Sequence, residues 1–264
     1  MKSILVATDF SPSADNAMNY AATLAQNLGA NLVLLHVYQI PISMSDVPVL
    51  MVSAEELRNN ADMGLMKSRE LVEKNFPGLS IQTESRLGDV VSEIQDLCEK
   101  HQPFAVVVGK HGASGVERFL FGSTALSVIR AIKTPVITVP DSIEEFSLAK
   151  VALASDGSPL GEHENVIRNF ILVTGARLHI VHVKESGSDQ TAITNILPEL
   201  NPECQTITNE DFNEGIAEYL EKNQIDLLMV IPHKHSFIER FLFKTHTAEL
   251  IRKIPHPVLT LGEM

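Results

Sequence analysis

The apolar run FAVVVG leads directly into a glycine-rich segment, GKHGASGVERFLFGST, in which Ser123 and Thr124 follow glycines at positions 109, 112 and 122. Glycine lets a backbone approach a ligand closely. A Gly-Ser-Thr step that opens a helix also offers free N–H groups, hydroxyl donors and the positive end of the helix dipole. The combination suits a bound phosphate. The alternative is that the glycines serve only the turns of a strand-to-helix connection, since the GxGxxG and Walker patterns are both absent.

The chain repeats itself, and the repeat gives this segment its context. SILVATDFSPS matches KVALASDGSPL, GANLVLLHVY matches GARLHIVHVK, and VERFLFGSTALSVIRAIKTPVITV matches IERFLFKTHTAELIRKIPHPVLTL at an offset of 122 residues. We therefore predict two copies of one domain, at 1–140 and 149–264. The short linker between them, 141–148, contains two adjacent glutamates and has no helical periodicity.

Within each copy, short Val/Ile/Leu-rich runs alternate with segments of helical periodicity, which predicts parallel strands joined by crossover helices. In the first copy the expected strands span 3–8, 31–38, 79–86, 104–109 and 136–139. Right-handed crossovers then favour a three-layer α/β/α sandwich around a five-stranded parallel sheet, with ligands beyond the carboxyl ends of the strands. The apolar runs 136–139 and 258–261 are the edges expected to pair between copies.

The same residues, in order and spacing, resemble the nucleotide signature of ATP-binding universal stress proteins: GxxG, nine residues, then GS. The resemblance covers nearly the whole chain. It includes Asp9 after the first strand, the His36-Val37 pair ending the second, and TPVITVP at the last. It implies an adenine nucleotide hydrolase-like fold with strand order 3-2-1-4-5, and a role in stress response or signalling.

The resemblance further implies an adenine nucleotide in the first copy: ATP, ADP or AMP, with or without Mg²⁺. Asp9 and the backbone at Val37 would hold the adenine, while Gly109 and Gly112 would lie along the ribose and phosphates. The implied binding residues are Thr8, Asp9, Val37, Gly109, His111, Gly112, Gly122, Ser123 and Thr124. Two alternatives stay open at this point. Asp9 before a Ser-Pro turn can simply cap the next helix, and His111 can point to solvent.

The second copy lacks the signature. Gly109, Gly112, Gly122 and Ser123 align with Ile231, Lys234, Lys244 and Thr245, whereas Asp156 and the His182-Val183 pair are retained. We therefore expect no ATP in the second copy, and we conclude at this point that the fold itself does not require the glycines. The two lysines either contact another anion or are solvated. His233, His235, His246 and His256 lack the spacing of a metal site, so none is predicted.

Composition narrows the classes of partner. The chain has 264 residues and a net charge of −12, divided equally between residues 1–146 and the remainder, with no basic tract. Such a surface disfavours nucleic acid. No apolar run is long enough for a membrane helix, and the amino-terminal residues do not form a leader, so we expect a cytoplasmic protein. Cys98 and Cys204 are expected to be reduced thiols.

The leading hypothesis is a nucleotide-responsive module rather than an enzyme. Slow ATP hydrolysis or phosphoryl transfer would need a positioned base and a metal-binding carboxylate, which the sequence does not clearly supply. A nucleotide-independent interaction module is the third hypothesis. The copies should pair within one chain, and a homodimer of chains is left open. The insertion 40–76 contains a helix predicted at Ala54–Asn75. Three roles are open for it: packing on its own domain, covering the nucleotide cleft, or contacting a partner.

Overall fold

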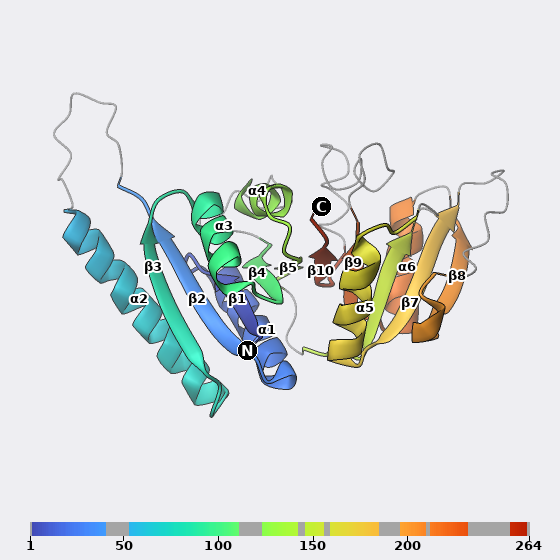
Figure 1. Ribbon diagram of the computed structural model, residues 1–264, viewed down its shortest axis with the longest axis horizontal. Helices are drawn as coiled ribbons and strands as arrows, with labels where there is room; N and C mark the ends of the chain where they lie inside the picture. The colour runs from blue at the N-terminus through green and yellow to red at the C-terminus, as the bar shows by residue number, and fades with distance from the viewer. Residues whose placement is uncertain are drawn as a thin grey trace, which may run out of the picture.

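The computed structural model describes residues 2–40, 53–110, 123–141, 146–155, 159–184, 196–209, 212–231 and 254–262. Within these ranges ten strands form one sheet, in the order β3-β2-β1-β4-β5-β10-β9-β6-β7-β8. Figure 1 shows the two halves of this sheet side by side, each accompanied by its own helices.

The first half follows the predicted alternation of strands and helices. Its elements are β1 (Ser3–Ala7), α1 (Pro12–Leu28), β2 (Asn31–Tyr38), α2 (Ala54–Asn75), β3 (Ile81–Leu87), α3 (Val90–His101), β4 (Ala105–Gly109), α4 (Ser123–Ala131) and β5 (Val136–Val139). All its strands are parallel, in the predicted order 3-2-1-4-5. β3 begins two residues later than predicted, because Leu79 still belongs to a turn in which its N–H donates to the Phe76 carbonyl at 3.2 Å.

The second half repeats this topology. Its elements are β6 (Lys150–Ser155), α5 (His163–Thr174), β7 (Arg177–Lys184), the 3₁₀ turn η1 (Pro198–Leu200), β8 (Glu203–Thr208), α6 (Phe212–Asn223), β9 (Leu227–Val230) and β10 (Val258–Thr260). The order β8-β7-β6-β9-β10 is again 3-2-1-4-5, with every pair parallel. The internal repeat in the sequence is therefore a repeat of structure.

The halves join where the sequence predicts, through β5 and β10. These strands pair antiparallel, with Val258 opposite Thr138, and the Thr138 hydroxyl donates to the Val258 carbonyl at 3.2 Å. Beyond β10, Gly262 lies so close to the first half that a Cβ there would overlap the Ile132 carbonyl oxygen. The domain boundaries at 140 and 149 stay a prediction, and residues 142–145 of the predicted linker lie outside the described residues.

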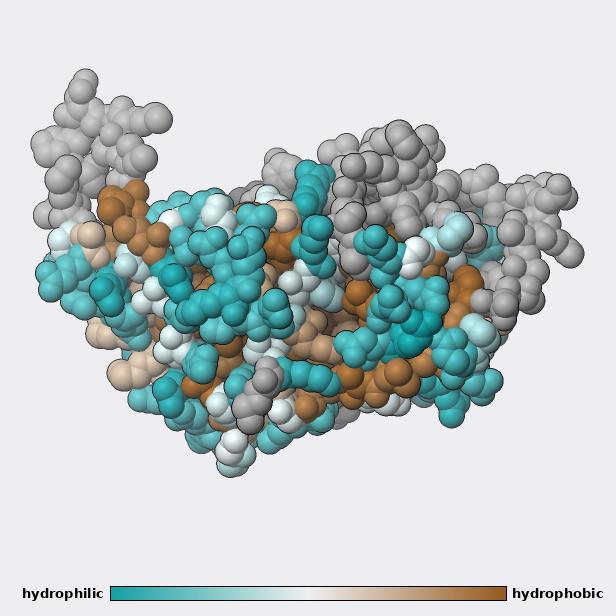
Figure 2. All heavy atoms as spheres, in the orientation of Figure 1, coloured by the Kyte–Doolittle hydropathy of each residue, from teal (hydrophilic) through white to brown (hydrophobic). Residues whose placement is uncertain are grey.

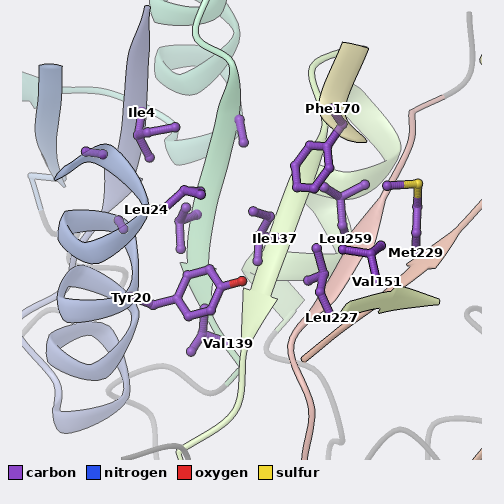
Figure 3. Packing of buried hydrophobic residues seen from close by; sticks show 14 of the residues in the cluster. Ile4, Tyr20, Leu24, Ile137, Val139, Val151, Phe170, Leu227, Met229 and Leu259 are labelled. Atoms are coloured by element: carbon purple, nitrogen blue, oxygen red, sulfur yellow. The ribbon is translucent and has the colours of Figure 1, made fainter. Parts of the chain in front are cut away.

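The sheet is buried on both faces, which explains why its central strands are apolar throughout. One layer of core residues packs between the sheet and helices α1, α2 and α5, and the other packs against α3, α4 and α6. Figure 3 shows the first layer crossing the seam, where Ile137 and Val139 of β5 lie near Leu259, Leu227 and Met229 of the second half. The two halves therefore share a hydrophobic core rather than only a pair of strands.

The long insertion in the first half contains α2, with the bounds that the sequence predicts. Ser53 and Glu56 form a capping box at its start, and its buried residues Ala61, Leu65, Ser68 and Val72 repeat at helical spacing. The helix packs on β2 and β3, so this part of the insertion covers its own domain. Residues 41–52 lie outside the described residues. No helix in the described ranges combines the length and apolarity that crossing a membrane requires.

Candidate functional site

The carboxyl ends of β1, β2 and β4 meet at one edge of the sheet. Ala7 pairs with Leu35, and the N–H of Thr8 donates to the Leu35 carbonyl at 2.8 Å. On the other side of β1, Val6 pairs with Val107, which puts Gly109 level with Thr8. The structure thus brings Thr8, Val37 and Gly109 together at the edge where a parallel sheet places its ligands.

Asp9 lies in the turn between β1 and α1. Its Oδ1 accepts a hydrogen bond from the Ser11 N–H at 3.0 Å, while the Phe10 N–H donates to the Thr8 hydroxyl oxygen at 3.0 Å. The helix cap is Ser11, whose hydroxyl oxygen accepts from the Ala14 N–H at 3.2 Å. The alternative that Asp9 caps α1 is therefore wrong. The turn instead holds the exposed Asp9 at the carboxyl edge of the sheet.

His36, which the sequence analysis treated only as part of a pattern, stabilises this turn. Its Nδ1–H donates to the Thr8 carbonyl at 2.8 Å, and its ring stacks on Phe10 with 4.2 Å between centroids. The second half repeats the bond, since His182 donates through Nδ1 to the Ser155 carbonyl at 2.9 Å. The His-Val pair thus has a structural role in both halves, with the histidine bonded to the end of the first strand.

Gly109 is required by packing as well as by its predicted ligand contact. A Cβ at this position would lie 2.8 Å from the Ser13 hydroxyl oxygen and 2.9 Å from the Ser13 carbonyl oxygen, in the first turn of α1. The second half forms the same strand order with Ile231 at this position, so the fold itself does not require the glycine, but the first turn of α1 does. In the second half, where Ile231 replaces it, α5 begins only at His163, which aligns with Asn16 inside α1. The bulkier residue thus accompanies a helix that starts a turn later.

Three polar residues at this edge escaped the sequence analysis. Burial lowers the pKa of the Lys110 ammonium to about 8, although the negative charge of Asp141 acts in the opposite direction. Burial and then the Asp9 carboxylate raise the pKa of the Asp15 carboxyl. Asn16 donates through Nδ2 to the Pro140 carbonyl at 2.7 Å, which ties the start of α1 to the end of β5. A lysine directly after a buried strand was the one available sequence signal.

The predicted phosphate end of the site is described only in part. α4 is described from Ser123 onward, and Thr124 is exposed. His111, Gly112, Gly122 and the Ser123 side chain lie outside the described residues.

At the corresponding edge of the second half a buried side chain stands in place of Gly109. Ile231 is 3% exposed and belongs to the same core layer as Leu160, the counterpart of Ser13. Asp156, Lys234, Lys244 and Thr245 lie outside the described residues, as do His233, His235 and His246. His256 is described, and burial lowers its pKa. Within the described ranges, no group of three or more His, Cys, Asp or Glu side chains could hold a metal ion.

The sequence matches the family model of the universal stress protein family over residues 1–140 and 198–261. A universal stress protein of Synechocystis, Slr1230, is 29% identical over 296 residues, an alignment that spans 98% of this chain and 99% of that protein. Coverage of both chains is therefore nearly complete.

Solved structures share the two-domain architecture. A universal stress protein from Archaeoglobus fulgidus superposes with a TM-score of 0.70 at 19% identity, covering 99% of this chain and 96% of that chain. A putative universal stress protein from Pseudomonas aeruginosa gives a TM-score of 0.62 at 16% identity, with 99% and 93% covered. At these identities the likeness establishes the tandem fold alone.

Proposed function

The chain belongs to the universal stress protein family, as a tandem two-domain member, and we propose that it binds an adenine nucleotide at the carboxyl edge of its first half. The observation that carries this proposal is the convergence of Thr8, Asp9, Val37 and Gly109 at one edge of the sheet. ATP, ADP and AMP share the adenosine and phosphate chemistry that these residues suit.

Different residues along the carboxyl edge of the sheet would contact the adenine and the phosphates. Asp9, held by its own turn, and the backbone at Val37 would receive the adenine, with Thr8 at the base of the site. Gly109, His111 and Gly112 would follow the ribose and phosphates. Gly122, Ser123 and Thr124 would complete the phosphate end, where the N–H groups and the dipole of α4 favour negative charge. Any Mg²⁺ would accompany the phosphates.

The second half would bind no ATP at the equivalent position. Ile231 stands there in place of Gly109, and its side chain is buried. This supports one nucleotide per chain.

Nucleotide occupancy would stabilise one arrangement of the halves and so serve stress response or signalling. α4 supports this idea because it contains Ser123 and Thr124, two of the predicted phosphate contacts, and its carboxyl end leads to Ile132, against Gly262 of the second half. β5, the next element, pairs with β10. A shift of α4 on nucleotide binding would therefore act directly on the contacts between the two halves.

Calorimetric titration with ATP tests the site. Gly112→Val and Gly122→Val should abolish binding, because each puts a side chain where backbone would face phosphate. Lys234→Val and Lys244→Val, at the equivalent positions of the second half, are matched controls that should bind like wild type. Equal affinity in all five proteins would overturn the assignment. Gly109→Val is unsuitable, since it would also disturb the packing of Ser13.

Three further measurements separate the alternatives. Mass analysis of nucleotide released from freshly purified protein identifies ATP, ADP or AMP. A nucleotide at a hundredfold excess over its dissociation constant should stabilise the fold by about 2.7 kcal/mol, and no shift in melting would favour a nucleotide-independent interaction module. Many steady-state turnovers of ATP, lost in Gly122→Val, would instead establish an enzyme.

A further inference from the structure

We propose that the groove between the two halves, on the side away from the nucleotide edge, binds a small planar anion with an aromatic ring. The groove lies at the amino ends of β1 and β4 and at Pro135, before β5, and α5 of the second half forms its other wall. It holds about 400 Å³, within the range of small-molecule sites. This inference does not depend on the proposed nucleotide site.

Two aromatic rings, one from each half, line the groove. Phe104, before β4, stacks on Phe170 of α5 with 5.3 Å between ring centroids and 16° between ring planes. Phe170 is 1% exposed, so its position is fixed by the core, whereas Phe104 is only partly buried. Figure 2 shows hydrophobic surface in the middle of the molecule, between the halves, with hydrophilic residues around it. The partly buried Phe104 ring, held in place by Phe170, is the aromatic surface that a planar ligand would contact here.

The polar residues of the groove favour an anion. Lys2 places its ammonium 5.9 Å from the centroid of the Phe104 ring, and Asn165, Asn169 and Gln102 contribute carboxamides. Among the described residues that line the groove, none carries a carboxylate and Lys2 is the one cation. The chain carries a net charge of −12, so a groove whose charged lining residue is a lysine differs from the chain as a whole. A ring against Phe104 and an acid group beside Lys2 would use both features.

The position of the groove would give its ligand an effect on both halves. Lys2 and Phe104 precede β1 and β4, and these same strands end at Thr8 and Gly109. Asn165 and Asn169 belong to the second half. A ligand that contacts all four would bind the assembled halves alone, and would therefore stabilise the seam.

The test is a fluorescence titration of the full chain with anilinonaphthalene sulfonate, a planar aromatic anion. Lys2→Glu and Asn169→Asp should each weaken binding about tenfold, because a carboxylate then faces the sulfonate. Lys67→Glu and Asn59→Asp make the same changes at exposed positions of α2 and should leave binding unchanged. Phe104→Leu, which keeps an apolar side chain, should weaken binding severalfold.

A loss confined to the groove variants, with wild-type circular dichroism, supports the site. Absence of dye binding, unchanged affinity in Lys2→Glu and Asn169→Asp, or equal losses in the α2 controls would overturn it. Saturating ATP should not displace the dye, and displacement by ATP would contradict a separate site.

Discussion

Two glycine-to-alanine substitutions, at Gly109 and Gly64, test whether the cost of an added Cβ depends on the kind of atom that it meets. At Gly109 the new Cβ would meet the Ser13 hydroxyl oxygen at 2.8 Å and the Ser13 carbonyl oxygen at 2.9 Å. At Gly64, in α2, it would meet the Phe10 ring at the shorter distance of 2.5 Å. Distance alone predicts that Gly64→Ala is the more damaging change. The nature of the neighbouring atoms predicts the opposite.

The expected magnitudes follow from those neighbours. Overpacking against a rigid neighbour costs about 1–3 kcal/mol. Alanine also reduces the conformational entropy of the unfolded chain relative to glycine, which offsets about 0.5–1 kcal/mol of that cost. Gly109→Ala should therefore destabilise the protein by about 1–2 kcal/mol. In Gly64→Ala the partner is the end of the Phe10 side chain, which is 36% exposed and can rotate away. Alanine inside a helix also gains about 1 kcal/mol over glycine, so the net effect there should be near zero.

Thermal denaturation without nucleotide, followed by far-ultraviolet circular dichroism, measures both variants against wild type. Gly109→Ala should lower the melting temperature by about 2–4 °C for each kcal/mol lost, and Gly64→Ala should melt like wild type. If Gly64→Ala proves the less stable of the two, or if Gly109→Ala has no effect, the packing argument for Gly109 is refuted and its glycine serves the ligand alone.

Two more predictions concern buried polar groups. Tyr20→Phe should leave the free energy of unfolding unchanged or raise it by about 1 kcal/mol, because the buried Tyr20 hydroxyl has no hydrogen-bond partner among the described residues. Tyr219→Phe should lower the free energy of unfolding by about 1 kcal/mol, because the Tyr219 hydroxyl is hydrogen-bonded to Nδ1 of His179 at 2.9 Å. Urea denaturation measures both variants, and a Tyr20→Phe protein less stable than the Tyr219→Phe protein would contradict both predictions. Lys110 has a folded pKa of about 8 against 10.5 for the free group, so the unfolded chain binds more protons between these values and stability should rise with pH across that window. Lys110→Met should flatten this rise in denaturation series at several pH values, and an unchanged slope would count against the buried ammonium as its source.

The fold could be predicted because its signals are local and occur twice. Buried parallel strands are apolar along their whole length, and the helix after each carries its own periodicity, so one half already specifies the topology. The second half then confirms the interpretation. Even the seam was predictable, because β5 and β10 are apolar edge strands that a solvated sheet could not leave exposed.

The site was less predictable because its contacts join distant parts of the chain. Nothing near Gly109 in the sequence reveals that Ser13 packs against its Cα, and nothing near Asn16 reveals the Pro140 carbonyl. Lys110 reads as an ordinary surface lysine until the structure buries it to 5% exposure. Asp9 was ambiguous in the same way, because an aspartate before a Ser-Pro pair is compatible both with capping α1 and with contacting a ligand. Only the bond from Ala14 to Ser11 assigns the cap to another residue.

Comparison of the halves shows that the second one changed in coupled pairs. Asn16 donates to the Pro140 carbonyl, and at the aligned positions His163 donates through Nε2 to the Gly262 carbonyl at 2.9 Å, so the bond is kept with a different donor. This bond fixes a helix start to the strand that forms the seam, and both halves need it.

Gly109 and Ser13, in contrast, became Ile231 and Leu160, and both replacements are buried apolar residues. One substitution alone would be costly, because isoleucine against an unchanged first turn of α1 would clash with backbone. With the helix starting later, the pair instead adds to the core. The second half thus combines Ile231 with a helix that starts about one turn later, whereas the first half combines Gly109 with the first turn of α1. A single reversal, Ile231→Gly, would therefore remove a buried apolar side chain without restoring that turn.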